Sequence, residues 1–262
     1  MGRLRFSSAL CAALLLIGIT ELPAQTVTYS WTGRASSNDW YVNANWVSSD
    51  TLNTAPPNQP AGADTSVVVF GDLTRTRIFA SHDVYANKLV FTGITQPYLL
   101  DGELDGPSYL SATFLGSGGI DYMPAQPVRS VIFTDFEFTD SQTWHVASGT
   151  LVLQGHIYDG DSGYTFTKTG AGTLVLGYNN NEFDTSTVVH NDGRLVLTAS
   201  DPYSNYHPLG SAALVIGPAS GSNNPVLGAA DPDNTGGNVT LNNNVTLNGV
   251  LTTENQAELH FT

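Results

Sequence analysis

Four short apolar blocks recur along the chain at a spacing of about twenty residues. Each places a small or turn residue before three apolar positions: SGTLVLQG (148–155), AGTLVLGY (171–178), DGRLVLTA (192–199) and SAALVIGP (211–218). Their first core leucines follow one another at 23, 21 and 19 residues: Leu151, Leu174, Leu195 and Leu214. A period of about 20 residues is too short for a pair of helices and suits one winding of a β-solenoid. Such a winding cannot bury its apolar face alone, so the block must recur.

Side chains alternate between the two faces of a strand, so the first and third positions of each block point the same way. We therefore expect two aliphatic columns inside the fold, the first through the four leucines above. The second column runs through the third positions: Leu153, Leu176, Leu197 and Ile216. The middle residues are expected to face outward or against a flanking loop: Val152, Val175, Val196 and Val215. The blocks thus predict an all-β fold, a parallel β-helix with strands stacked in register.

The pattern divides the chain into three regions: a signal peptide (1–24), an N-terminal β cap with the first irregular windings (25–128), and a β-solenoid (129–262). The sequence stops in mid-pattern at Thr262, without the polar cap that ends a solenoid, which predicts that the solenoid is incomplete at its C-terminus.

The N-terminal half is less regular than the rest. Residues 26–46 carry three tryptophans and are typical of a hairpin or cap, while 65–72, 86–93 and 129–138 have the composition of strands. An antiparallel β-sandwich is the alternative fold for residues 26–130, because turns every 8–12 residues or so also fit that architecture.

The first 24 residues have the features of a secretory signal peptide: Arg3 and Arg5, an apolar run at 9–19, and Ala24 as the cleavage point. The one cysteine, Cys11, lies within that run, so the exported chain must fold without disulfides. We expect a secreted or cell-surface protein with no membrane insertion after cleavage. Its formal net charge of −14 argues against nucleic acid and anionic membrane surfaces as partners.

Residues 168–198, KTGAGTLVLGYNNNEFDTSTVVHNDGRLVLT, form the most distinctive stretch of the chain. They resemble the autotransporter-associated β-strand repeat, also called the passenger-associated transport repeat. The matching positions are Lys168, Gly170, Gly172, Thr173, Leu174, Leu176, Asn181, Phe183, Thr187, Gly193 and Leu195. Thr185 stands where the family pattern has glycine. The resemblance, best over 166–198, implies a right-handed parallel β-helix in a surface-displayed or secreted bacterial passenger, and a repeat that supports secretion and folding outside the cell.

No group of residues in the sequence carries a recognisable catalytic, cofactor or metal pattern, and we predict no such residues. Asp135 and Glu137 would share one face of a strand and could present two acids to a sugar, although an ordinary solvated strand face explains them more simply. The acidic turns at 158–163 and 231–238 suit calcium or, more simply, Asp/Gly turns. The histidines are scattered without metal-ligand spacing: His82, His145, His156, His190, His207 and His260.

Together these features predict an exported structural or adhesive protein without catalytic activity, with surface glycans or other cells as its candidate partners. The alternative is a carbohydrate-active β-helix enzyme or a glycan-binding module. Three or more carboxylates on adjacent windings of one outer face would favour an enzyme, and exposed coplanar aromatic rings would favour a binding module. Four tryptophans could either stack on sugars or lie in the core: Trp31, Trp40, Trp46 and Trp144.

Overall fold

A computed structural model of the chain describes most of the residues after the first 25. The described residues are 26–50, 52, 54–57, 65–73, 76–102, 112–177, 181–184, 186–198, 208–217, 225–230, 238–248, 251–255 and 258–261. The predicted signal peptide lies outside them. The helix η1 (Asn43–Asn45) is a 3-10 turn, and among the described residues no helix is long and apolar enough to cross a membrane.

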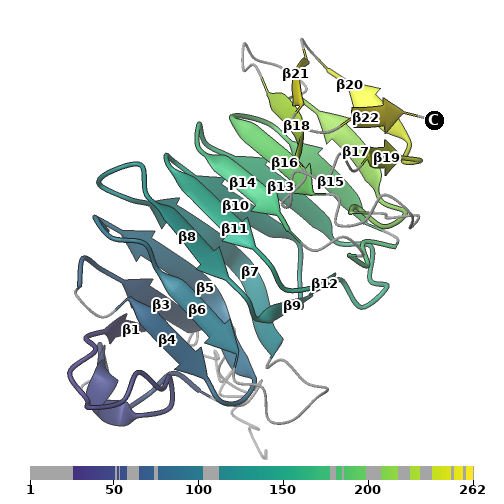
Figure 1. Ribbon diagram of the computed structural model, residues 1–262. Helices are drawn as coiled ribbons and strands as arrows, with labels where there is room; N and C mark the ends of the chain where they lie inside the picture. The colour runs from purple at the N-terminus through teal and green to yellow at the C-terminus, as the bar shows by residue number, and fades with distance from the viewer. Residues whose placement is uncertain are drawn as a thin grey trace, which may run out of the picture.

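The described part of the chain is all-β and is dominated by two long sheets (Figure 1). In spatial order the first sheet contains β2 (Trp46–Ser48), β1 (Val27–Trp31), β3 (Ser66–Phe70), β5 (Val84–Thr92), β7 (Ala112–Met123), β10 (Gln142–Val146), β13 (Thr165–Thr169), β15 (Thr187–His190), β17 (Ala213–Ile216) and β20 (Val245–Leu247). The second contains β4 (Arg77–Ala80), β6 (Leu99–Gly102), β8 (Arg129–Ile132), β11 (Thr150–Leu153), β14 (Thr173–Leu176), β16 (Arg194–Thr198), β18 (Val226–Ala230) and β21 (Thr252–Asn255).

Two further sets of strands complete the fold. β9 (Asp135–Phe138) and β12 (Ile157–Tyr158) branch from the first half of β7, and β19 (Asn238–Leu241) pairs with β22 (Glu258–Phe261). From β3 onward, the strands of the two sheets alternate along the chain, so each sheet grows strand by strand in sequence order, toward the yellow end of Figure 1. We call the residues added at each return of the chain a layer.

The predicted aliphatic columns are present for the first three blocks. Leu151 pairs with Leu174, and Leu174 with Leu195, across parallel neighbours β11, β14 and β16. Leu153, Leu176 and Leu197 form the second column in the same register, and all six side chains are buried in one core. Of the middle valines, Val175 is partly exposed, whereas Val152 and Val196 are buried.

The fourth block does not belong to these columns. Leu214 and Ile216 lie in β17 of the first sheet, where Leu214 pairs with Val188 on one side and Val245 on the other. The place next to Leu195 is taken by Leu227 of β18. The prediction for Leu214 was wrong because strands of both sheets bury alternate apolar residues against the same core, so an isolated block does not reveal its sheet.

The N-terminal strands pair in the same manner as the later ones. β3, β5 and β7 are parallel neighbours in the first sheet, and the only antiparallel pair among the described strands is β1 with β2. This pairing does not fit the antiparallel sandwich considered for residues 26–130. The predicted strand at 129–138 is divided into β8 and β9, which lie in different ladders.

A hairpin caps the first strand of the long sheet, as the tryptophan-rich opening predicted. Its rings pack edge to face, with centroids 5.0 Å apart for Trp31 and Trp46 and 4.8 Å for Trp40 and Trp46. The segment before η1 covers the edge strand of the second sheet, because the Trp40 N–H donates to the Phe79 carbonyl at 2.7 Å. Both sheets therefore begin under the same cap.

Lys168 binds the backbone at the glycine-rich corner that follows β13. The side chain is fully buried, and its ammonium group donates to the carbonyls of Gly170, Gly172 (2.8 Å) and Asp192 (2.6 Å). It thus ties the corner between β13 and β14 to the equivalent corner of the next layer. Burial lowers the pKa of Lys168 to about 8. Gly193, at a φ of 68°, leaves the space that this ammonium group occupies.

Candidate functional site

A third, shorter ladder lies beside the two sheets and carries the candidate site. It consists of the first residues of β5 and β7 followed by β9 and β12, all parallel. Residues alternate in it as in the sheets, so Val84, Thr113, Phe136 and Ile157 are buried. Their neighbours face outward in one file, which we call the outward column: Tyr85, Phe114, Glu137, Tyr158 and Glu182.

Aromatic side chains flank the carboxylate of Glu137 in this column. The rings of Tyr85 and Phe114 are stacked, with centroids 4.6 Å apart and planes 11° from parallel. Glu137 is the next residue along the ladder, and Tyr158 follows it. Because neighbouring strands lie about 4.8 Å apart, Phe114 and Tyr158 are separated by roughly 10 Å with Glu137 between them.

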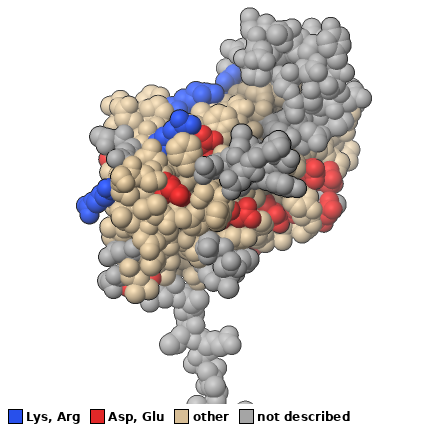
Figure 2. Space-filling view, turned by 60° about the horizontal axis from the view of Figure 1, so that its bottom comes forward, with Lys and Arg blue, Asp and Glu red and all other residues tan. Residues whose placement is uncertain are grey.

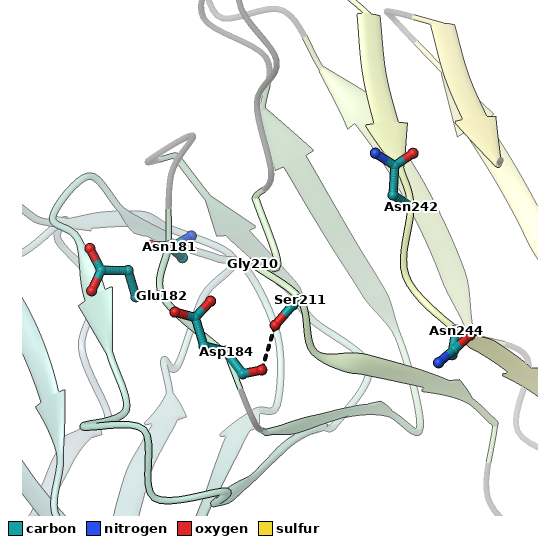
Figure 3. Close-up of a pocket in the computed structure, with 7 residues that line it drawn as sticks. All are labelled: Asn181, Glu182, Asp184, Gly210, Ser211, Asn242 and Asn244. Atoms are coloured by element: carbon teal, nitrogen blue, oxygen red, sulfur yellow. Dashed lines mark hydrogen bonds between the residues drawn. The ribbon is translucent and has the colours of Figure 1, made fainter.

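The surface is hollowed beside this column. A depression of about 300 Å³ is lined by Ala112, Asp135, Phe136, Glu137, His156, Tyr158 and Glu182. A second one of about 460 Å³ is lined by Asn181, Glu182, Asp184, Gly210, Ser211, Asn242 and Asn244 (Figure 3). Glu182 lines both, so the two depressions adjoin and continue along the ladder into later layers.

The carboxylates at this site differ in their hydrogen-bond and ion-pair partners. Asp135 accepts the backbone N–H of His156 at 2.7 Å, and Asp83 accepts that of Ala112 at 3.0 Å, so both stabilise the contact with the next layer. Glu182 lies 3.6 Å from Nε2 of His156. In the part of the chain that the structure describes, the side-chain carboxylate of Glu137 has no hydrogen bond or ion pair. Burial, and then the charge of Asp83, raise its pKa.

The second depression combines acids with side-chain amides. The side-chain amide of Asn181 stabilises the fold, because it accepts the Ile157 N–H at 2.9 Å and donates to the Pro208 carbonyl at 2.9 Å. Ser211 donates to the backbone carbonyl of Asp184 (Figure 3). Asn244 lies exposed on the opposite side of the hollow, with its amide available to solvent.

Negative charge is concentrated on part of the surface. In Figure 2 acidic side chains follow one another across the middle and right of the visible face, whereas Lys and Arg lie toward its left and upper edges. At the outward column, the charge of Asp161 above all, and then burial and further carboxylates, raise the pKa of Tyr158. A cation would therefore be favoured over an anion at this ladder.

The structure places the residues singled out in the sequence as follows. Asp135 and Glu137 share the outer face of β9, as predicted, while Phe136 and Phe138 between and after them are buried. All four tryptophans are buried, so they belong to the core rather than to a sugar-stacking surface.

The acidic turn at 158–163 is built as a turn in its own right. Asp159 is buried and accepts the N–H of Asp161 at 3.0 Å and the hydroxyl of Ser186. The other calcium candidate, 231–238, lies outside the described residues except for Asn238. Within the described ranges, no three Asp, Glu, His or Cys side chains gather as a metal site.

Four members of the outward column were missed in the sequence: Tyr85, Phe114, Tyr158 and Glu182. The repeat period predicts the positions of two of them. Phe114 precedes Glu137 by 23 residues and Tyr158 follows it by 21, which are the spacings of the first leucine blocks. Applying that period to an outward residue would have found both neighbours.

Comparison with known proteins identifies no relative, since no family model, curated protein or solved structure matches the chain. The resemblance of residues 168–198 to the autotransporter-associated repeat therefore stays a prediction.

Proposed function

We propose that this protein is an exported structural or adhesive passenger-type protein whose stacked strands form a right-handed parallel β-helix. The proposal rests on one column of leucines that pair in register across parallel strands: Leu151, Leu174, Leu195 and Leu227. All four are buried in one continuous core. In such a fold each finished layer presents a template edge and an apolar face to the next. Burial of each added layer then supports folding outside the cell without disulfides.

Export is tested by expressing the full chain in a Gram-negative host and following its exposure to added protease. We expect the full chain to reach the cell surface or the medium, and a variant without residues 1–24 to stay inside the cell. Retention of the full chain in the cytoplasm would contradict the proposal, provided that a known secreted protein leaves the same cells.

A glycan-binding function is the second candidate, and the outward column favours it. Partly exposed rings, a carboxylate without a side-chain partner among the described residues, and adjoining depressions are features of a recognition surface rather than of a purely structural stalk. We expect no hydrolysis or elimination of polysaccharides at this surface, because Asp135 holds the backbone of the next layer. Release of reducing ends from any bound polysaccharide would contradict that expectation.

A further inference from the structure

We propose that the outward column binds a polysaccharide carrying free amino groups, with Glu137 as the anion that receives an ammonium group. This inference deepens the proposed adhesive function and rests on it. The five side chains of the column are partly exposed, so they can contact molecules in solution.

The first argument is the setting of Glu137. Phe114 and Tyr158 precede and follow it in the ladder, and ring faces attract ammonium groups within about 6 Å of their centres. The carboxylate is half-buried and its pKa is raised, so an incoming cation would displace little water and gain a partly desolvated counter-charge.

The second argument is charge complementarity along the column. Glu182 lies two strands beyond Glu137 in the ladder, and Asp83 contributes to the field at Glu137 from the other side. The whole chain carries a formal net charge of −14. Sulfated or carboxylated glycans would be repelled here, whereas an amino sugar polymer presents positive charges at regular intervals.

The third argument is shape. The depressions of about 300 and 460 Å³ adjoin at Glu182 and extend the site along the stacking direction. An extended polymer can follow this track, with amino groups at Glu137 and hydroxyl groups at the exposed amide of Asn244. A lone ammonium ligand would use only the hollow around Glu137, so the second depression favours a chain of sugars.

The test is calorimetric titration of the full exported chain with fully deacetylated chitohexaose, using the N-acetylated hexamer as the neutral counterpart. We expect the amino form to bind at pH 6, where its amines carry charge, and the acetylated form to bind about tenfold more weakly or not at all. The variant Glu137→Gln should lose at least about tenfold in affinity, since one partly buried charge contact is removed.

The matched control is Asp101→Asn. It removes the same charge from the second sheet, where Asp101 pairs with Arg77 at 3.0 Å, and should leave affinity unchanged. Tyr158→Leu should weaken binding several-fold by removing a ring face. Circular dichroism and unfolding of each variant establish that it folds, which we expect for Glu137→Gln because the side chain of Glu137 makes no hydrogen bond or ion pair with the described residues.

Three results would overturn the inference. They are equal affinity of Glu137→Gln and the parent chain, equal affinity for the two hexamers, and equal or tighter binding of a lysine hexapeptide, which would make the site a general polycation surface. The export proposal and the binding-site proposal can be refuted independently. A chain that binds the amino sugar but stays in the cytoplasm refutes the export proposal alone, and a secreted chain that does not bind refutes the site alone.

Discussion

Replacing Gly193 by alanine tests how tightly successive layers approach at the Lys168 corner. A Cβ at this position would press on the Gly170 carbonyl oxygen and lie 2.7 Å from both the Gly172 carbonyl oxygen and the Lys168 ammonium nitrogen. The positive φ adds about 1–2 kcal/mol for any residue with a Cβ. Displacing packed backbone adds about 1–3 kcal/mol. We expect a total loss of about 2–5 kcal/mol, concentrated at the β13–β14 and β15–β16 corners.

Gly93→Ala is the matched control, because Gly93 has nearly the same φ, 64°, and an added Cβ would meet nothing within 4 Å. It should lose only the conformational part, about 1–2 kcal/mol. The difference between the two variants isolates the close approach of the layers.

The assay is urea unfolding combined with amide hydrogen exchange, since a stack of repeats can lose its layers separately and a single transition is not guaranteed. Exchange should accelerate in β13, β14 and β16 of Gly193→Ala and should stay near that of the parent in the same strands of Gly93→Ala. Equal losses in the two variants would refute the account of the corner, as would unchanged exchange in those strands.

Two further perturbations test the core. Leu174→Ala removes a fully buried side chain between Leu151 and Leu195 and should lower the free energy of unfolding by about 2–5 kcal/mol. The control Val175→Ala, on the outer side of β14, should lower it by less than about 1 kcal/mol. Similar losses in the two variants would contradict the inward position of the leucine column. Burial lowers the pKa of His190 to about 4, so the unfolded chain takes up the proton first and stability should fall by about 3 kcal/mol as the pH drops from about 6.5 to 4. His190→Gln should show a shallower pH dependence over that range, and an unchanged slope would contradict the assignment.

The sequence predicted the architecture where one rule acts on every layer. Strand alternation and the spacing of Leu151, Leu174 and Leu195 were enough to place these residues in one parallel register, because only inward aliphatic side chains can close such a core. The capping role of the tryptophan-rich opening was also predictable, since three large rings in twenty-one residues need a shared interior.

The position of Leu214 and the composition of the outward column were harder to predict. An apolar block fits either sheet, and the connections between strands vary in length, so counting from one block does not fix the ladder of the next. Tyr85 lies 29 residues before Phe114 and Glu182 lies 24 residues after Tyr158, so the period that places Phe114 and Tyr158 beside Glu137 does not place these two. The role of Lys168 was hidden for another reason, since a lysine in a strand ordinarily reaches solvent and here turns inward to backbone carbonyls.

The cap closes the N-terminal end of both sheets. A stack of parallel strands would otherwise offer the free amides and carbonyls of its first strand to any passing chain. Here β2, three residues long and running the opposite way, occupies that position in one sheet, while Asn38 and Trp40 bond to Phe79 at the margin of the other. So short and reversed a border is a poor template for intermolecular pairing. We therefore expect this end of the stack to pair poorly with other copies of the chain.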